Sequence, residues 1–281
     1  MFISQIAKGQ ASNMATEIQE VIIDSIEQLT SFIDQYDDRY LFRGQTGHYL
    51  NDNKNISIPT SFQRHGCVPP LMFKWSHYSK ALIRAFGGGN YHDLDIGVSQ
   101  AILQHYGWRS FFIDLSKEVH IACWFAANSY SDNKRIHMSE DCEENPVWLV
   151  HKEGSYSETK NSGHIYVIDT KYFLDNEIKI HDLTKLADDE GRLRFQAQSA
   201  CLVEGKEGFL PPNSIVAHLI VTHDVLVKYY ESKNIKSTLD VFPNRDNDYI
   251  LKCLLNLPWY KMPSDDDFSI PIYHRGLEIP E

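Results

Sequence analysis

The alternation of apolar and polar residues along the chain predicts short strands and helices, most clearly over residues 101–128. Residues 111–113 (FFI) form an aromatic and β-branched run, which predicts a buried strand. This strand is expected to end at Asp114 and Ser116, because both residue types are common helix N-caps. A helix is expected next, since four apolar residues then recur at helical spacing. They are Val119, Ala122, Cys123 and Ala126.

A second short strand is predicted to begin at Tyr40 in the segment YLFRGQ (residues 40–45), and it carries Arg43 near its end. We expect this strand to stop at Gly44, with Gln45 just beyond it. Further towards the N-terminus, residues 21–23 predict a strand, and residues 24–27 (DSIE) have the sequence of a capping box that begins a helix.

The remaining pattern predicts four more strands and four more helices. The strands are expected at residues 147–150, 163–168, 192–204 and 215–221. The helices are expected at residues 71–86, 94–105, 223–233 and 249–255. The first two of these strands are expected to pair as a hairpin, with the polar segment between them exposed.

The chain of 281 residues shows no internal repeat and no low-complexity linker that would divide it. The sequence therefore predicts an α+β fold, a single mixed-sheet domain flanked by helices, over residues 20–256. Residues 1–19 are expected to form an N-terminal extension, and residues 257–281 a C-terminal tail on the surface.

Charge and cysteine content narrow the class of protein. The net charge of −11 argues against sequence-blind binding to phosphate backbones, although a local basic cleft stays compatible with it. Cys123 and Cys201 lie in apolar runs and are expected to be buried free thiols. No signal peptide, long apolar span or lipidation motif is found, which predicts a cytoplasmic protein without membrane association. No HxxxH or HExxH pair occurs, so no metal is expected.

Arg43 has two interpretations. It is either an exposed arginine at a strand end or an anion clamp, because the planar guanidinium matches the geometry of phosphate and carboxylate groups. Gly44 beside it would let a ligand approach the backbone closely.

Other polar residues also have a structural and a functional interpretation. His105 and Tyr106 either pack at the turn before Gly107 or face a ligand. Asp114 is either a helix N-cap or a catalytic acid. Arg194 is either a site residue or the buried ion-pair partner of Asp114.

Three segments together resemble the FRG domain, a bacterial and phage-associated family named for its phenylalanine–arginine–glycine motif. They are residues 42–45 (FRGQ), 103–107 (LQHYG) and 194–198 (RFQAQ). Residues 239–243 also fit the Leu-Phe-Pro region of the family, and the resemblance spans roughly residues 20–250. The chain departs from the family pattern in a few places. These are Arg109, Ser110, Leu115, Ser199 and Ala200.

The resemblance implies a layout similar to the NAD site of ADP-ribosyltransferases, with a split sheet. In those enzymes an arginine or histidine on the first core strand contacts NAD, and a late strand supplies glutamate or glutamine. The implied order here is Arg43, then residues 111–116, then residues 196–204. The implied cofactor-binding residues are Phe42, Arg43, Gly44, Gln45, Gln104 and Arg194. The implied catalytic residues are Arg43, His105, Tyr106, Asp114, Ser116, Gln198 and Glu204.

Cleavage of the nicotinamide–ribose bond builds oxocarbenium character on the ribose, which oriented polar groups must stabilise. In the implied site, Arg43 holds the pyrophosphate or the nicotinamide ribose, and Ser116 or Tyr106 positions the nicotinamide end. The chain has no late-strand QxE or ExE motif. The group near the ribose hydroxyls would come from one of three residues, namely Glu204, Asp114 or Gln198.

The resemblance therefore implies NAD as a co-substrate and a macromolecular target, either RNA, DNA or protein. Such an enzyme would act as a toxin or effector in anti-phage defence or in a toxin–antitoxin system, with an antitoxin or chaperone as a further partner. One alternative is a metal-independent RNase that uses His105, Arg43 and Arg194 around a phosphate. Another is a non-enzymatic module that binds a ligand or partner in the same crevice.

Overall fold

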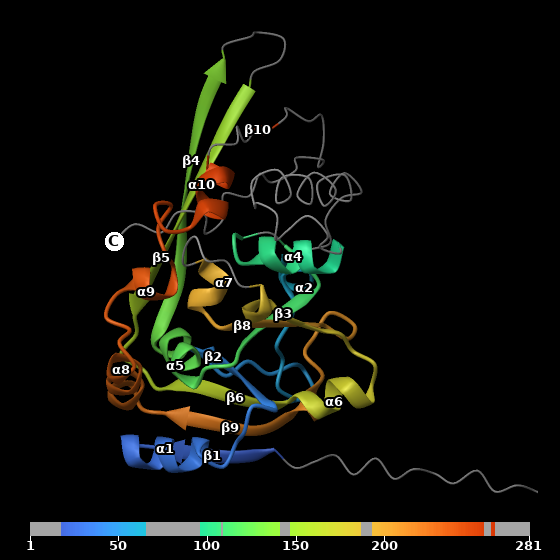
Figure 1. The fold of residues 1–281 in the computed structure, drawn as a ribbon, viewed down its shortest axis with the longest axis vertical. Helices are drawn as coiled ribbons and strands as arrows, with labels where there is room; N and C mark the ends of the chain where they lie inside the picture. The colour runs from blue at the N-terminus through green and yellow to red at the C-terminus, as the bar shows by residue number, and fades with distance from the viewer. Residues whose placement is uncertain are drawn as a thin grey trace, which may run out of the picture.

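The computed structural model describes residues 18–65, 96–107, 109–140, 147–186, 193–255 and 260–261. Within these residues the chain forms a seven-stranded sheet and a three-stranded sheet, with helices packed around them (Figure 1). The predicted α+β class with a mixed sheet is confirmed, whereas the second sheet was not foreseen. No described helix has the length and apolar character that crossing a membrane requires.

The seven-stranded sheet has the order β1-β9-β6-β2-β3-β8-β7. β1 and β9 pair in parallel, and the other neighbours pair antiparallel. In that order, the strands are β1 (Gln19–Ile23), β9 (Ile215–Val221), β6 (Gly163–Asp169), β2 (Tyr40–Gln45), β3 (Phe112–Ser116), β8 (Ala200–Glu204) and β7 (Ile180–Asp182). The predicted strands at residues 163–168 and 215–221 are confirmed, because both consist of residues buried between neighbouring strands.

Helices pack on both faces of this sheet. One face carries α5 (Val119–Ala127), α8 (His223–Ser232) and α1 (Ile26–Ile33) over a core to which β2, β6 and β9 contribute alternate residues. Farther along the same face, α4 (Ile96–Gln104) and α10 (Tyr249–Leu255) contribute to a core over β3 and β8. The opposite face is covered by α6 (Thr170–Asp175). Cys123 and Cys201 are buried free thiols, as predicted.

The shorter helices connect these elements. They are α2 (Ser61–His65), α7 (Arg194–Ala197), α9 (Thr238–Val241) and the 3-10 turns η2 (Leu183–Lys185) and η3 (Pro212–Ser214). The predicted helices at residues 94–105, 223–233 and 249–255 are confirmed. The helix predicted at residues 71–86 lies outside the described residues.

β2 and β3 meet at a single paired position, Phe42 opposite Ser116, although each strand has at least five residues. β2 pairs with β6 along its whole length, and β3 pairs with β8 along its whole length. The two halves of the sheet are therefore joined at one point and part beyond it. This separation positions the cavity described below.

β4 (Asn128–Glu140) and β5 (Val147–Glu158) form a long hairpin that projects from the rest of the structure (Figure 1). The predicted hairpin between residues 147–150 and 163–168 is therefore wrong. β5 pairs with β4 and with β10 (Tyr260–Lys261), which lies in the segment expected as a surface tail. Residues 128–135 and 151–158, which pair with each other in this hairpin, are mostly polar, and the hydroxyls of Ser131 and Ser155 lie 2.7 Å apart across it. Such residues give no apolar periodicity, which explains why the sequence pattern missed this pairing.

Two strands extend beyond the residues at which they were predicted to end. β2 continues through Gly44 and Gln45, and Asp114 and Ser116 lie within β3, so neither caps α5. The N-cap of α5 is Glu118, which makes no side-chain capping bond. Residue 43 is thus followed by two further strand residues, which extend the wall of the cavity.

Two further predictions need correction near helix starts. The predicted strand at residues 192–204 begins only at Ala200, because residues 194–197 form the helical turn α7. At α1, Ser25 is the N-cap and accepts from the backbone N–H of Gln28. Gln28, rather than Glu27, then reaches back to the backbone N–H of Asp24 at 3.0 Å.

Candidate functional site

A cavity of about 350 Å³ opens where β2 and β3 part. Both halves of the sheet contribute to its wall, through Arg43 and Gln45 of β2 and through Asp114 and Ser116 of β3. Small-molecule sites in proteins have volumes of roughly 300–1,000 Å³. The cavity is therefore large enough for a good part of a nucleotide-sized ligand.

Arg43 lies half-buried in this wall, and its Nη1 donates to the backbone oxygen of Asp114 at 2.7 Å. This bond crosses the gap between the two strands and fixes the guanidinium. Burial lowers the pKa of Arg43 to about 10; Arg64 acts in the same direction, and Asp114 opposes it. Arg43 therefore stays charged near neutral pH. Arg64 also lines the cavity, so two arginines face it in a chain whose net charge is −11.

His105 follows the end of α4, and its ring orientation is set by Gln198. Nδ1 of His105 lies 3.0 Å from Oε1 of Gln198, whose Nε2 donates to the backbone oxygen of Val241 at 3.2 Å. Because an amide oxygen only accepts, Nδ1 carries the proton, and Nε2 holds a lone pair in the neutral ring. Burial lowers the pKa of His105, so the ring is neutral near pH 7.

Asp114 carries the one carboxylate among the described residues that line the cavity. Its Oδ1 lies 3.8 Å from Nε2 of His105, and neither atom has a hydrogen-bond partner in the described part of the chain. The Asp114 side chain is 45% exposed, whereas that of His105 is 4% exposed. Each acceptor atom needs a donor, so this gap suits a ligand hydroxyl or N–H group.

Ser116 and Gln104 line the cavity, but protein groups already hold them. The Ser116 hydroxyl donates to the backbone oxygen of Gln198 at 2.8 Å and accepts from the backbone N–H of Glu118 at 3.0 Å. The side-chain oxygen of Gln104 accepts from the Ser110 hydroxyl. Ser116 therefore positions Gln198, and Gln104 ties the end of α4 to the segment before β3.

Gly44 is required by helix packing. A Cβ atom at this position would lie 1.7 Å from the backbone oxygen of Ala122 in α5. The close approach that the sequence suggested for a ligand is made instead by this helix. Phe42, two residues earlier, is buried in the core beneath the same helix.

Tyr106 and Arg194 are buried behind His105, and neither lines the cavity. The Tyr106 hydroxyl and the backbone N–H of Arg194 both donate to Oδ2 of Asp248, at 2.7 and 2.8 Å. Nη1 of Arg194 donates to the backbone oxygen of His105 at 2.9 Å. The structural interpretation that paired Arg194 with Asp114 is wrong, because the guanidinium of Arg194 instead reaches the backbone oxygen of His105 and lies over the rings of Tyr106 and Phe242.

Glu204 is the third predicted residue that lies away from the cavity. It pairs with Phe112 at one end of β8, whereas Ala200, at the other end, lines the cavity. Of the three groups predicted near the ribose hydroxyls, Asp114 and Gln198 reach the cavity and Glu204 does not.

The structure adds aromatic residues that the sequence analysis missed. Those that line the cavity, besides Phe42, are Tyr49, Phe125, Tyr130, Tyr156 and Phe242. The rings of Tyr156 and Phe242 stack with centroids 5.0 Å apart. Tyr130 and Tyr156 belong to the hairpin of β4 and β5, which the sequence pattern did not predict, so no pattern pointed to them. Phe242 lies in the Leu-Phe-Pro segment of the family pattern, and that segment could have identified it as a candidate site residue.

A second group of side chains was also missed. One nitrogen from each of His48, His164 and His218 lies within 4.8 Å of the others. The expectation of no metal considered only short spacings such as HxxxH, and these three residues are far apart in the sequence.

Comparison with known families supports the resemblance found in the sequence. Residues 38–135 match the family model of the FRG domain. The chain carries an FRG domain. The matched segment runs from β2 into β4 and includes Arg43, Arg64, His105 and Asp114. Comparisons with curated proteins and with solved structures gave no match.

The three residues that name the FRG motif have three separate roles in this fold. Phe42 packs in the core, Arg43 crosses to β3, and Gly44 admits α5. The FRG domain match thus covers the charged part of the cavity. Gln198 and Phe242 come from beyond the matched residues.

Proposed function

We propose that the cavity of the FRG domain binds NAD and that the protein transfers ADP-ribose to a macromolecule. The observation that carries this proposal is the position of Asp114, whose carboxylate faces the neutral ring of His105 beside the charged Arg43. A carboxylate beside a gap that can accept ligand hydroxyls suits a reaction in which positive charge develops on a sugar.

NAD has three kinds of groups, and the cavity has a partner for each. The two arginines, Arg43 and Arg64, suit the pyrophosphate. Oδ1 of Asp114 and Nε2 of His105 suit the donor hydroxyls of a ribose. The aromatic residues that line the cavity, Tyr49 among them, suit stacking on a nucleobase or on nicotinamide.

In the proposed reaction, the bond between ribose C1′ and nicotinamide breaks, and its electron pair leaves with nicotinamide. The cationic ribose that results is stabilised by the carboxylate of Asp114. A nucleophile of the target then forms a bond to C1′, and its proton passes to Nε2 of His105 or to water. The products are nicotinamide and an ADP-ribosylated target.

The parting of β2 and β3 supports the further proposal of an ADP-ribosyltransferase-like split of the sheet. Such a split needs two half-sheets that diverge around the ligand, and the single paired position between Phe42 and Ser116 permits this. We propose the biological role of a toxin or effector on the basis of the FRG domain match alone.

The RNase alternative has less support, because it needs His105, Arg43 and Arg194 around one phosphate. Arg194 lies behind His105, in contact with its backbone oxygen, and does not line the cavity. A non-enzymatic binding module would use the same cavity without turnover, so it differs from the proposal in chemistry alone.

The test is to incubate the purified chain with a cell lysate and NAD labelled on its adenylate part. Free nicotinamide and label transferred to macromolecules are measured for the unmodified chain, for Asp114→Asn and for the control Asp175→Asn. Asp175 is an exposed acid at the end of α6. We expect Asp114→Asn to lower nicotinamide release by about 100-fold or more, because losing one such electrostatic contact typically costs that much.

The control variant is expected to match the unmodified chain. Digestion of the labelled product by nuclease or protease then identifies the target class. Equal nicotinamide release by Asp114→Asn would contradict the role of Asp114. RNA cleavage without added NAD would favour the RNase, and NAD binding without nicotinamide release would favour the binding module.

A further inference from the structure

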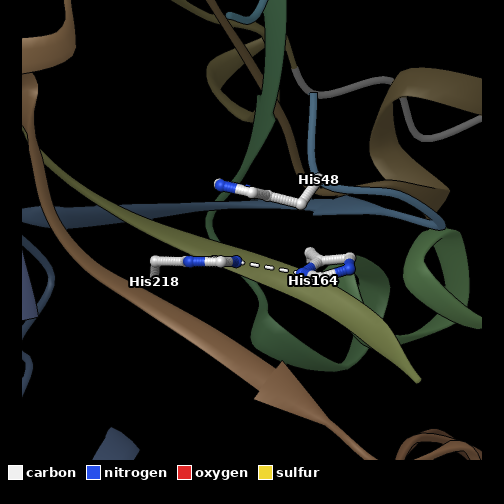
Figure 2. A group of neighbouring side chains, drawn as sticks. All are labelled: His48, His164 and His218. Atoms are coloured by element: carbon white, nitrogen blue, oxygen red, sulfur yellow. Dashed lines mark hydrogen bonds between the residues drawn. The ribbon is translucent and has the colours of Figure 1, made fainter. Parts of the chain in front are cut away.

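Three histidines from separate parts of the chain meet on the face of the seven-stranded sheet that lies opposite α5 (Figure 2). His164 projects from β6 and His218 from β9, while His48 follows the end of β2. One ring nitrogen of each lies within 4.8 Å of the others.

We propose that His48, His164 and His218 bind a divalent transition-metal ion of the zinc type. Imidazole nitrogen is a preferred ligand of such ions, whereas magnesium and calcium prefer oxygen ligands. Three protein ligands leave the fourth position of a tetrahedral ion open for water. The site goes beyond the proposed function and does not rest on it.

The spacing of the rings fits this ion. Zinc–nitrogen bonds of about 2.0–2.1 Å in a tetrahedral site place ligand nitrogens roughly 3.3–3.4 Å apart. Nδ1 of His164 and Nε2 of His218 are already 3.0 Å apart, joined by a hydrogen bond (Figure 2). A metal ion takes the place of the proton between them, and His164 then carries its proton on Nε2. His48 stacks on His218 with ring centroids 4.4 Å apart, and it lies outside regular secondary structure in the segment after β2.

His218 and His48 each have a further hydrogen-bond partner that orients the ring. Oε2 of Glu20 lies 3.2 Å from Nδ1 of His218, which directs Nε2 of that ring towards His164. The Tyr166 hydroxyl lies 2.9 Å from Nδ1 of His48. Metal-binding histidines usually have a hydrogen-bond partner on their second nitrogen, often a carboxylate such as that of Glu20.

The sheet register explains why these groups meet. Glu20 lies opposite His218 on β1 and β9, and His218 lies opposite Tyr166 on β9 and β6. The side chain of His218 is 2% exposed, whereas that of Glu20 is 62% exposed, so the carboxylate approaches the buried ring from solvent. The strand pairing thus forms most of the site before any ion binds.

The site also adjoins the cavity of the FRG domain. Thr46 and Tyr49 line that cavity, and His48 lies between them in the chain. A metal held by His48 would therefore tie the loop after β2 to β6 and β9. We infer that the ion stabilises one wall of the cavity.

The test is a titration of the full, tag-free and metal-stripped chain with Co²⁺, followed by competition with Zn²⁺. Co²⁺ in a tetrahedral site gives visible absorption bands, so the readout reports coordination geometry and stoichiometry without any measurement of activity. We expect one equivalent to bind, and we expect Zn²⁺ to displace it. His164→Gln is expected to weaken binding by at least 100-fold, and the control His120→Gln is expected to bind like the unmodified chain. His120 lies on α5 beside Glu118, away from the three histidines.

Glu20→Gln provides a second measurement at an exposed residue, where folding is not at risk. It is expected to weaken binding about 10-fold, because partners of metal ligands typically contribute that much. Zn²⁺ is also expected to raise the melting temperature of the unmodified chain and not that of His164→Gln. Absence of binding, or equal binding by His164→Gln and the unmodified chain, would overturn the proposal whatever the outcome with NAD.

Discussion

Nε2 of His105 and Oδ1 of Asp114 face each other across 3.8 Å in the cavity of the FRG domain. The backbone of Asp114 accepts from Arg43 at 2.7 Å, so the residue is held while its carboxylate stays available to a ligand. His105 is held in turn by Gln198 at 3.0 Å. The gap between the two acceptors is therefore fixed on both sides, and preorganised polar groups of this kind are what catalysis on a charged sugar needs.

The first prediction concerns pH. Burial lowers the pKa of His105; Asp114, Gln198 and Asp248 oppose the shift, and Arg194 adds to it. The unfolded histidine binds its proton near pH 6.5, whereas the folded one binds it at lower pH. The stability contributed by the neutral His105 ring is therefore fully present above about pH 6.5. It is lost as the pH falls from that value towards the lower pKa of the folded protein.

His105→Asn keeps a donor near the position of Nδ1 and removes the titrating ring. Chemical unfolding at pH 7.5 and pH 5.5 is expected to show a smaller loss of stability on acidification for this variant than for the unmodified chain. An equal loss in both proteins would contradict a lowered pKa of His105.

A second prediction tests the anion site through Arg64, which is exposed and lines the cavity. Arg64→Gln is expected to weaken binding of ADP-ribose about 10-fold, since a charge-assisted contact to phosphate contributes roughly 1.5–3 kcal/mol. Calorimetry of ADP-ribose and of nicotinamide alone provides the comparison, because nicotinamide has no phosphate. Arg39→Gln is the control, as Arg39 pairs with Asp169 at the surface. Unchanged ADP-ribose affinity in Arg64→Gln would remove Arg64 from the site.

A third prediction concerns Gly44. Gly44→Ala places a Cβ atom 1.7 Å from the backbone oxygen of Ala122, so α5 or β2 must shift. We expect the free energy of unfolding to fall by about 3 kcal/mol or more, at the upper end of the usual cost of overpacking. Gly47→Ala is the control, because its Cβ would meet the exposed side chain of Tyr49 at 3.2 Å, and that side chain can move. Denaturant unfolding measures both, and similar losses would contradict this account of α5 packing.

A fourth prediction assigns Tyr106 to structure. Its hydroxyl is buried and donates to Oδ2 of Asp248 at 2.7 Å. Tyr106→Phe is expected to lower the free energy of unfolding by about 2 kcal/mol, the usual range for a hydrogen bond to a charged group. Tyr172→Phe, on α6, is the control. A loss of NAD binding without a loss of stability would instead show that Tyr106 acts in NAD binding.

Elements that depend on local pattern could be predicted from the sequence. The strand at residues 215–221 and the helix at residues 249–255 were predicted with the bounds that the structure shows. In β9, buried residues dominate the strand, and in the helix α8 apolar residues recur at the helical period. Such elements can be predicted because their pattern lies in residues that are neighbours in the sequence. Arg43, His105 and Asp114 were predicted in the same way, as polar residues at the ends of such elements.

Contacts between distant segments were decided by the tertiary structure. Arg43 and Asp114 are 71 positions apart, and His48 and Tyr166 are 118 positions apart. The hairpin of β4 and β5 is formed by backbone bonds of polar residues, and the displacement of Glu204 from the cavity follows from strand register. The sequence by itself determined the strands and helices that carry a clear apolar pattern, such as β9 and α10, and where the FRG motif lies. The pairing of those segments decided which side chains meet, because a hydrogen bond between strands or a contact of Gly44 with α5 depends on position in space and leaves no local pattern.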